Sequence, residues 1–220
     1  MQEYDFLKAI GISNKDQFWA VNARLAKVQN ASNILCYMRL MIKKSSENGS
    51  VVTKKAFEKF GSSIELYPGV TEWFDLINVL GKKNGVTVLH YLNSSGLKEM
   101  VEGTFIAKKF KEIYACSFMY DANGAAIWPA VAVDFTAKTQ FLFMINKGID
   151  KISDNKKVNE FMPYEDRPIP FDHMIYFGDG DTDIPCMKLI KQQGGNPIAV
   201  YKASDRKKKA EAENSFGMVM

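Results

Sequence analysis

The sequence predicts an α/β protein in which a parallel β-sheet carries helices on both faces and is preceded by a small all-helical domain. Two observations predict this class. Residues 1–66 hold apolar residues at helical spacing, whereas residues 67–220 alternate short apolar runs with helical segments. Such alternation is typical of a parallel sheet covered on both faces. We therefore divide the chain into a helical domain, 1–66, and an α/β core, 67–220.

The helical domain is expected to contain three main helices. Ser13 and Asp16 resemble a capping box ahead of an apolar stripe that runs from Phe18 to Val28. A second stripe spans residues 34–42. Thr53 is expected to cap a third, short helix. These stripes are interpreted as the core of a helical bundle.

The α/β core opens after a Pro-Gly turn with a helix around residues 73–80. Strands are predicted at 86–92, 113–120, 126–135, 173–178 and 197–201, and helices at 97–110, 138–152 and 184–191. Pro129 indicates that the third strand lies at an edge or contains a bulge, because proline cannot donate to the ladder.

Composition and charge exclude several functional classes. The chain has 29 Lys plus Arg against 25 Asp plus Glu, and a net charge of +4 is too small to indicate a nucleic-acid or membrane partner. Cys36, Cys116 and Cys186 form no CxxC pair, which predicts neither a disulfide framework nor a zinc site. No leader pattern and no apolar run of ~20 residues is present, so we expect a cytoplasmic protein.

Two strand ends hold residues that could carry chemistry, since ligands of parallel sheets bind beyond the carboxyl ends of the strands. Ser94, Ser95 and Gly96 follow one strand, where hydroxyls and backbone N–H groups either bind an anion or cap the next helix. Asp179 directly follows another strand and suits a hard cation such as Mg²⁺. Asp183 opens the next helix and either caps it or joins the cation site.

These pieces occur in a particular order: an apolar strand with a Ser-Gly turn, a Lys at a helix start, and an apolar strand followed by GDxxxD. In this order they resemble the haloacid dehalogenase superfamily of Mg²⁺-dependent phosphohydrolases, which have a Rossmann-like sheet. "LNSSG" matches the second motif and "YFGDGDTD" the fourth, and the helical segment stands where that superfamily inserts a helical cap. The resemblance covers nearly the whole chain.

The resemblance implies roles for individual residues. Asp179 would ligate Mg²⁺, with Asp183 supporting the metal site directly or through water. Ser94, with Ser95 as the alternative, would hydrogen-bond the phosphoryl group beside Gly96, and Lys138 would offset its charge. The implied substrate is a small phosphorylated metabolite, hydrolysed through an aspartyl phosphate.

Lys147 is a second candidate for the lysine of the third motif. A helix that follows a crossover begins at the carboxyl end of the strands, so its first residues lie near the site. Lys138 stands at that start, whereas Lys147 would lie ~13 Å farther along the helix. We therefore assign the role to Lys138.

The first motif of the superfamily, DxDxT, is absent from this sequence. The only Asp-x-Asp arrangements lie within residues 179–183, and Asp134 is followed two residues later by Thr136 rather than Asp. The chain therefore looks as though it starts just after that motif, and an upstream DxDxT segment would be expected to supply activity. The motif's strand would lie between those ending at Ser94 and Asp179, and its absence would open a slot of ~10 Å.

Two functional hypotheses follow from this absence. The first is a haloacid dehalogenase-like phosphohydrolase that is inactive as this chain because the attacking carboxylate is missing. The second is a catalytically dead remnant that binds a phosphorylated ligand or a protein partner.

Overall fold

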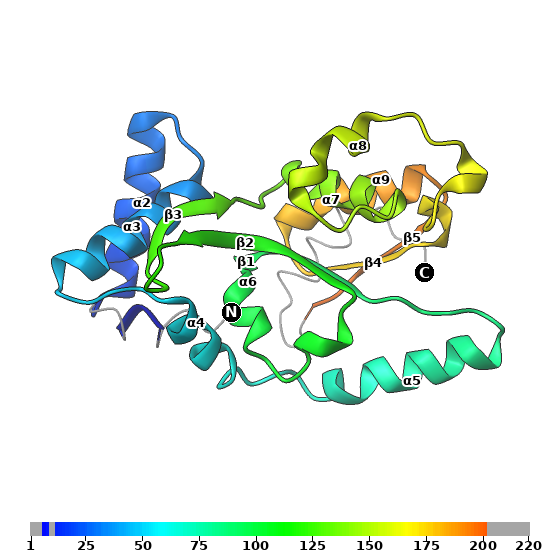
Figure 1. Ribbon diagram of the computed structural model, residues 1–220, viewed down its shortest axis with the longest axis horizontal. Coiled ribbons are helices and arrows are strands. Elements are labelled where there is room, and N and C mark those ends of the chain that lie inside the picture. Colours follow the sequence, from blue (N-terminus) through cyan, green and yellow to red (C-terminus); the bar gives the residue numbers. More distant parts are fainter. Residues whose placement is uncertain (1–5, 9–11, 202–220) are drawn as a thin grey trace. The chain divides into compact units, whose positions relative to one another are not determined.

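The computed structural model describes residues 6–8 and 12–201 and shows a mixed α/β protein (Figure 1). The chain divides into two compact units, Met1–Val133 and Asp134–Met220. The predicted boundary between residues 66 and 67 falls inside the first unit, because the helices of residues 12–66 pack on the strands that follow them. No helix in the described ranges combines the length and apolar character needed to cross a membrane.

The described N-terminal part of the first unit includes the helices α2 (Lys15–Gln29), α3 (Asn33–Glu47) and α4 (Lys54–Gly61), and residues 6–8 are helical as well. Residues 12–66 contain no strand, in agreement with the helical pattern of the sequence. Helix α3 packs on β3, and the Phe57 ring of α4 stacks on Phe118 of β2 with 5.5 Å between centroids. The helical segment therefore shares a core with the sheet.

The caps of these helices agree only in part with the sequence analysis. Thr53 caps α4 as predicted, since its Oγ1 accepts the Ala56 N–H at 3.1 Å. The predicted capping box at Ser13 is wrong by one residue. Asn14 is the cap of α2, and its Oδ1 accepts the Gln17 N–H at 2.9 Å. Asn is as good a cap as Ser, so the sequence pattern did not separate the two.

Helix α4 packs against α6 (Lys98–Glu102) so closely that the two backbones are in contact. A Cβ atom on Gly103 would lie 1.9 Å from the Glu58 carbonyl oxygen, and one on Gly61 would lie 1.9 Å from the Met100 carbonyl oxygen. Only glycine fits at either position. This contact joins the helical segment to the helix that follows the Ser94 strand.

The first unit contains a three-stranded mixed sheet formed by β1 (Tyr91–Leu97), β2 (Glu112–Tyr120) and β3 (Ala126–Val131). Strands β1 and β2 are parallel, whereas β2 and β3 are antiparallel, so the all-parallel prediction is wrong for this sheet. Pro129 lies in the edge strand β3, as its missing N–H predicts.

The helix α5 (Val70–Lys83) precedes β1, and its C-terminal residues lie close to the run 86–88. The predicted strand at 86–92 begins only at Tyr91, because β2 starts opposite that residue and offers no partner to residues 86–89. The predicted helix at 97–110 is reduced to α6 and a 3₁₀ turn at Ala107–Lys109.

The second unit pairs β4 (Ile175–Gly178) with β5 (Asn196–Ala199) in parallel. Its helices are α7 (Ala137–Asn146), α8 (Asn155–Asn159) and α9 (Ile184–Gln192). Further 3₁₀ turns are Ile152–Asp154, Tyr164–Asp166, Phe171–His173 and Asp181–Asp183. Among the described residues the strands form two separate sheets, where the sequence predicted one.

Candidate functional site

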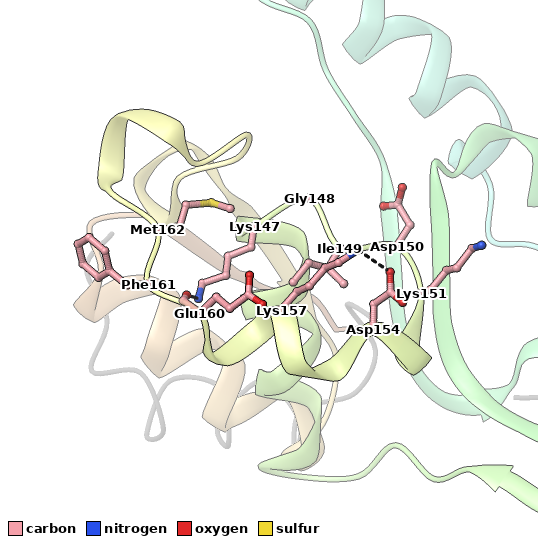
Figure 2. A pocket seen from close by; sticks show the side chains of 10 residues that line it. All are labelled: Lys147, Gly148, Ile149, Asp150, Lys151, Asp154, Lys157, Glu160, Phe161 and Met162. Atoms are coloured by element: carbon pink, nitrogen blue, oxygen red, sulfur yellow. Dashed lines mark hydrogen bonds and ion pairs between the residues drawn. The ribbon is translucent and has the colours of Figure 1, made fainter.

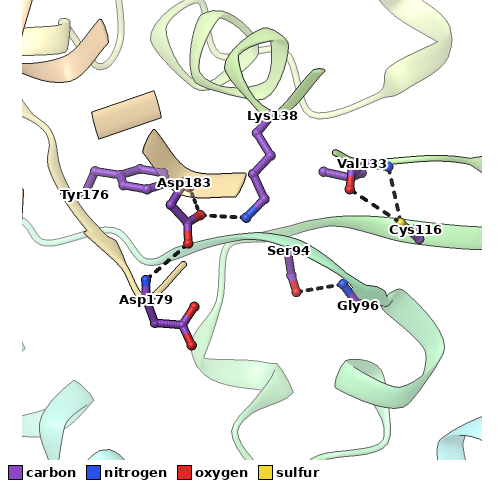
Figure 3. Close-up of polar contacts among 8 residues, drawn as sticks. All are labelled: Ser94, Gly96, Cys116, Val133, Lys138, Tyr176, Asp179 and Asp183. Atoms are coloured by element: carbon purple, nitrogen blue, oxygen red, sulfur yellow. Dashed lines mark hydrogen bonds and ion pairs between the residues drawn. The ribbon is translucent and has the colours of Figure 1, made fainter. Parts of the chain in front are cut away.

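The carboxylate of Asp183 is the centre of a buried polar cluster in the second unit (Figure 3). Lys138 Nζ lies 2.6 Å from Asp183 Oδ1, and the Tyr176 hydroxyl donates to the same oxygen at 2.8 Å. The other oxygen, Oδ2, accepts the backbone N–H of Asp179 at 3.1 Å. Asp183 thus forms hydrogen bonds to residues of three parts of the unit, namely the helix of Lys138, the strand of Tyr176 and the turn at Asp179.

Each member of this cluster is positioned by a regular element. Lys138 lies in the first turn of α7, Tyr176 in β4, and Asp183 immediately before α9. Asp179 follows the last residue of β4. A Cβ atom on Gly178 would lie 2.7 Å from the Asp183 Cβ, so glycine is required where the strand end meets the start of α9.

Asp183 does not act as the helix cap that its position allowed. It occupies the N-cap position of α9 but makes no side-chain capping bond. Its oxygens instead accept from the side chains of Lys138 and Tyr176 and from the turn after β4. Of the two alternatives that the sequence left open, capping is therefore excluded.

Burial controls the protonation of the groups next to Asp183. Burial raises the pKa of the Tyr176 hydroxyl far above its usual range, and the nearby Cys186 and Asp183 raise it further. Tyr176 therefore stays protonated and donates to Asp183. Burial also raises the pKa of the Cys186 thiol to about 11, which keeps this thiol neutral and unreactive at neutral pH.

Asp179 differs from Asp183 in its exposure. Figure 3 shows its carboxylate pointing away from that of Asp183, and the residue is exposed. In residues 6–8 and 12–201 no three His, Cys, Asp or Glu side chains gather in an arrangement that could hold a metal ion. Mg²⁺ can be bound through one or two protein carboxylates with water completing its shell, so Mg²⁺ binding at Asp179 stays a prediction. Asp183 Oδ1 already binds Lys138 and Tyr176, so the supporting role predicted for Asp183 also stays a prediction.

The Ser94 segment lies in the first unit at the end of β1. Ser94 pairs with Ala115 and Leu97 with the next residue of β2, so Ser95 and Gly96 bulge out of the ladder. Ser94 Oγ accepts the Gly96 N–H at 3.0 Å. The turn that the sequence predicted after the strand is therefore a β-bulge within the last residues of β1.

The Ser95 hydroxyl oxygen is buried and has no hydrogen-bond partner within the described ranges. The Ser95 carbonyl oxygen accepts the Tyr37 hydroxyl of α3 at 3.4 Å. The helical segment thus contacts the bulge directly.

The predicted site residues are distributed over both units. The structure brings Lys138, Asp179 and Asp183 together in the second unit, and it holds Ser94 to Gly96 in the first. Convergence of the two groups on one phosphoryl group stays a prediction.

Lys147, the alternative to Lys138, lies at the other end of α7 (Figure 2). Its amine donates to the carbonyl oxygens of Val158, at 2.6 Å, and Glu160. It lines a cavity of about 360 Å³ whose lining residues all lie between positions 147 and 162. Lys147 therefore supports a loop, and of the two lysines Lys138 is the one that contacts the Asp183 cluster.

Tyr176 is the member of the cluster that the sequence analysis did not identify. Buried residues alternate with exposed ones along β4, so Tyr176 lies on the same face as Gly178. In a strand, residues two apart share a face, so the position of Tyr176 two residues before Gly178 is the signal that could have placed it beside the aspartate turn.

Comparison with protein-family models finds no match for this chain. The chain is similar to an uncharacterized protein of Borreliella burgdorferi, with 28% identity over 207 residues; the match covers 84% of this chain and 69% of the relative. The description of this relative names no function.

Proposed function

We propose that this chain carries the Mg²⁺-binding and phosphoryl-binding groups of a haloacid dehalogenase-like phosphohydrolase that acts on a small phosphomonoester. The observation that carries the proposal is the buried Lys138–Asp183 pair, which anchors the Asp179 turn at the carboxyl end of β4. This is the arrangement that the third and fourth motifs of that superfamily imply for these three residues.

A purely structural role explains this pair poorly. Lys138 and Asp183 are only 4% and 5% exposed, and removing two charges from water costs about as much as their attraction returns. An apolar pair of similar size would stabilise the unit as well or better. A fixed positive charge at a strand end is useful, however, where a phosphoryl group has to be bound.

The strand pairing supports a Rossmann-like core as the finer description of the fold. Strand β4, helix α9 and strand β5 form a parallel βαβ unit. Strands β1 and β2 are also parallel and are connected through α6. Both are the building blocks from which Rossmann-like sheets are made.

The protein groups have separable tasks in this proposal. Lys138 holds positive charge beside the turn, and Asp179 supplies one carboxylate to the cation. Ser94 accepts the Gly96 N–H through its oxygen, so its own hydrogen remains for a phosphoryl oxygen. A bound Mg²⁺ would neutralise charge on the phosphoryl oxygens.

Covalent catalysis needs an attacking carboxylate in addition, and the sequence contains no DxDxT motif to provide it. A binding protein derived from such an enzyme is therefore the second candidate function. The two candidates share the binding step and differ in turnover. A cytoplasmic location and a small phosphorylated metabolite as ligand belong to both proposals.

Calorimetric titration of inorganic phosphate tests the shared binding step. We expect binding with Mg²⁺ and at least tenfold weaker binding with EDTA. Asp179→Asn should weaken the Mg²⁺-dependent binding at least tenfold, because it removes the carboxylate charge at constant size. Asp181→Asn is the matched control, since Asp181 is an exposed acid of the same turn, and it should leave the affinity unchanged.

Two results would overturn the proposal. One is the absence of any Mg²⁺-dependent binding by the native chain. The other is an equal loss in both aspartate variants, which would show that only the overall charge of the turn matters.

A further inference from the structure

Helix α5 exposes an apolar face that no residue described in the first unit covers. Leu76, Val79 and Leu80 are 68%, 69% and 53% exposed. Their spacing of three and four residues places them side by side on one face of the helix. Single exposed apolar residues are ordinary, but a continuous face on one helix indicates an interaction surface.

The opposite face of α5 holds the helix in place. The Phe74 ring lies 4.9 Å from the His90 ring and 5.3 Å from the Phe110 ring, measured between centroids. Asn78 Oδ1 lies 2.9 Å from His90 Nε2. At 100° per residue, Leu76 and Val79 lie about 140° to 160° away from Phe74. The contacts of Phe74 and Asn78 therefore hold α5 in an orientation in which Leu76 and Val79 point away from His90 and Phe110.

The charges that flank this face are arranged symmetrically. Glu72, Leu76, Val79 and Lys83 follow one another at spacings of four, three and four residues, which makes one straight stripe along the helix. The centre of the stripe lies between residues 77 and 78. In an antiparallel pair of such helices, Leu76 would meet Val79 of the other copy and Glu72 would meet Lys83.

We propose that this face binds a second copy of this chain, with the two α5 helices antiparallel about a twofold axis that passes near residues 77 and 78. The self-complementary order of acidic, apolar, apolar and basic residues is the argument for this occupant, because a twofold interface has to complement itself. Burial of Leu76, Val79 and Leu80 supplies the attraction, and the two Glu72–Lys83 contacts set the antiparallel register. The proposal is independent of the proposed phosphoryl-binding function.

Sedimentation equilibrium of the full chain over a range of concentrations tests this inference. We expect the mass to rise from that of the 24.8 kDa monomer toward twice that value. Leu76→Asp should abolish the rise, because it places a charge at the centre of the interface. Val28→Asp is the matched control: Val28 is an apolar residue of α2 that is 69% exposed, as Val79 is, and this variant should still dimerise.

Charge exchange tests the register. Glu72→Lys or Lys83→Glu alone should weaken self-association, since each places like charges opposite one another. A mixture of the two single variants should associate again, because each copy then carries the charges that complement the other. A chain that stays monomeric at all concentrations, or a dimer that survives Leu76→Asp, overturns the proposal. Failure of the mixture to associate overturns the antiparallel register.

Discussion

Lys138 Nζ lies 2.6 Å from Asp183 Oδ1, and both side chains are almost completely buried. A second ion pair among the described residues of this unit, Lys157 with Asp154, has a similar separation of 3.0 Å, but its side chains are 61% and 39% exposed. The same chemistry therefore occurs in two environments within one unit. This contrast provides an internal control for the energetics of the proposed site.

Lys138→Met should lower the free energy of unfolding by about 3–5 kcal/mol, because it leaves the Asp183 carboxylate buried without its counter-charge. Lys157→Met should cost less than about 1 kcal/mol, since solvent screens that pair. Denaturant unfolding followed by circular dichroism measures both values.

A double variant identifies the cause of the loss. If the uncompensated charge is responsible, Lys138→Met combined with Asp183→Leu should recover much of the stability lost in Lys138→Met alone. Equal, small costs for Lys138→Met and Lys157→Met would contradict the buried pair.

The stability of the second unit should fall as the pH rises above 8. Burial raises the pKa of the Cys186 thiol from its ordinary 9.0 to about 11. Between these values the folded state keeps a proton that the unfolded state loses, so the folded state binds more protons and stability decreases with pH. We expect a loss of roughly 1 kcal/mol between pH 8 and 10.

Cys186→Ala should flatten this pH dependence, whatever its effect on the absolute stability. The comparison is best made below pH 10, where tyrosines of the unfolded chain remain protonated. An unchanged slope in Cys186→Ala would show that another group is responsible.

Ser94 and Ser95 should differ in their effect on phosphate binding. Ser94 Oγ accepts the Gly96 N–H, and this bond does not use the hydrogen of the Ser94 hydroxyl. We expect Ser94→Ala to weaken Mg²⁺-dependent phosphate binding about tenfold, which corresponds to one hydrogen bond to a charged group. Ser95→Ala should have a smaller effect in the same titration. The opposite order would transfer the role to Ser95.

Much of the fold could be predicted from local patterns. The three helices before residue 66, the cap at Thr53 and the edge position of Pro129 follow from periodicity and from the hydrogen-bonding capacity of single residues. The division into two sheets could not be predicted in this way, because strand pairing depends on contacts between residues far apart in the chain. The late start of β1 at Tyr91 has the same cause, since apolar β-branched residues form a strand only where a partner strand is available.

Three of the candidate site residues could be grouped from the sequence, and their roles stay predictions. Asp179, Asp183 and Lys138 were identified from their places after a strand and at a helix start, and the structure brings them together. Tyr176 was missed because a tyrosine in an apolar strand resembles core. The arrangement of Ser94 relative to Asp179 depends on how the two units come together, and local sequence patterns hold no information about that arrangement.

The most direct test of this account is the hydrolysis of an aryl phosphate by the highly purified 220-residue chain, measured with Mg²⁺ and with EDTA. We predict that phosphate binds but that no EDTA-sensitive turnover occurs, because Lys138, Ser94 and Asp179 are proposed only to bind the phosphoryl group and Mg²⁺, and none of them is proposed as the attacking carboxylate. Robust EDTA-sensitive turnover, abolished by Asp179→Asn but retained by Asp181→Asn, would contradict it. Such turnover would show that another residue of this chain supplies the nucleophile.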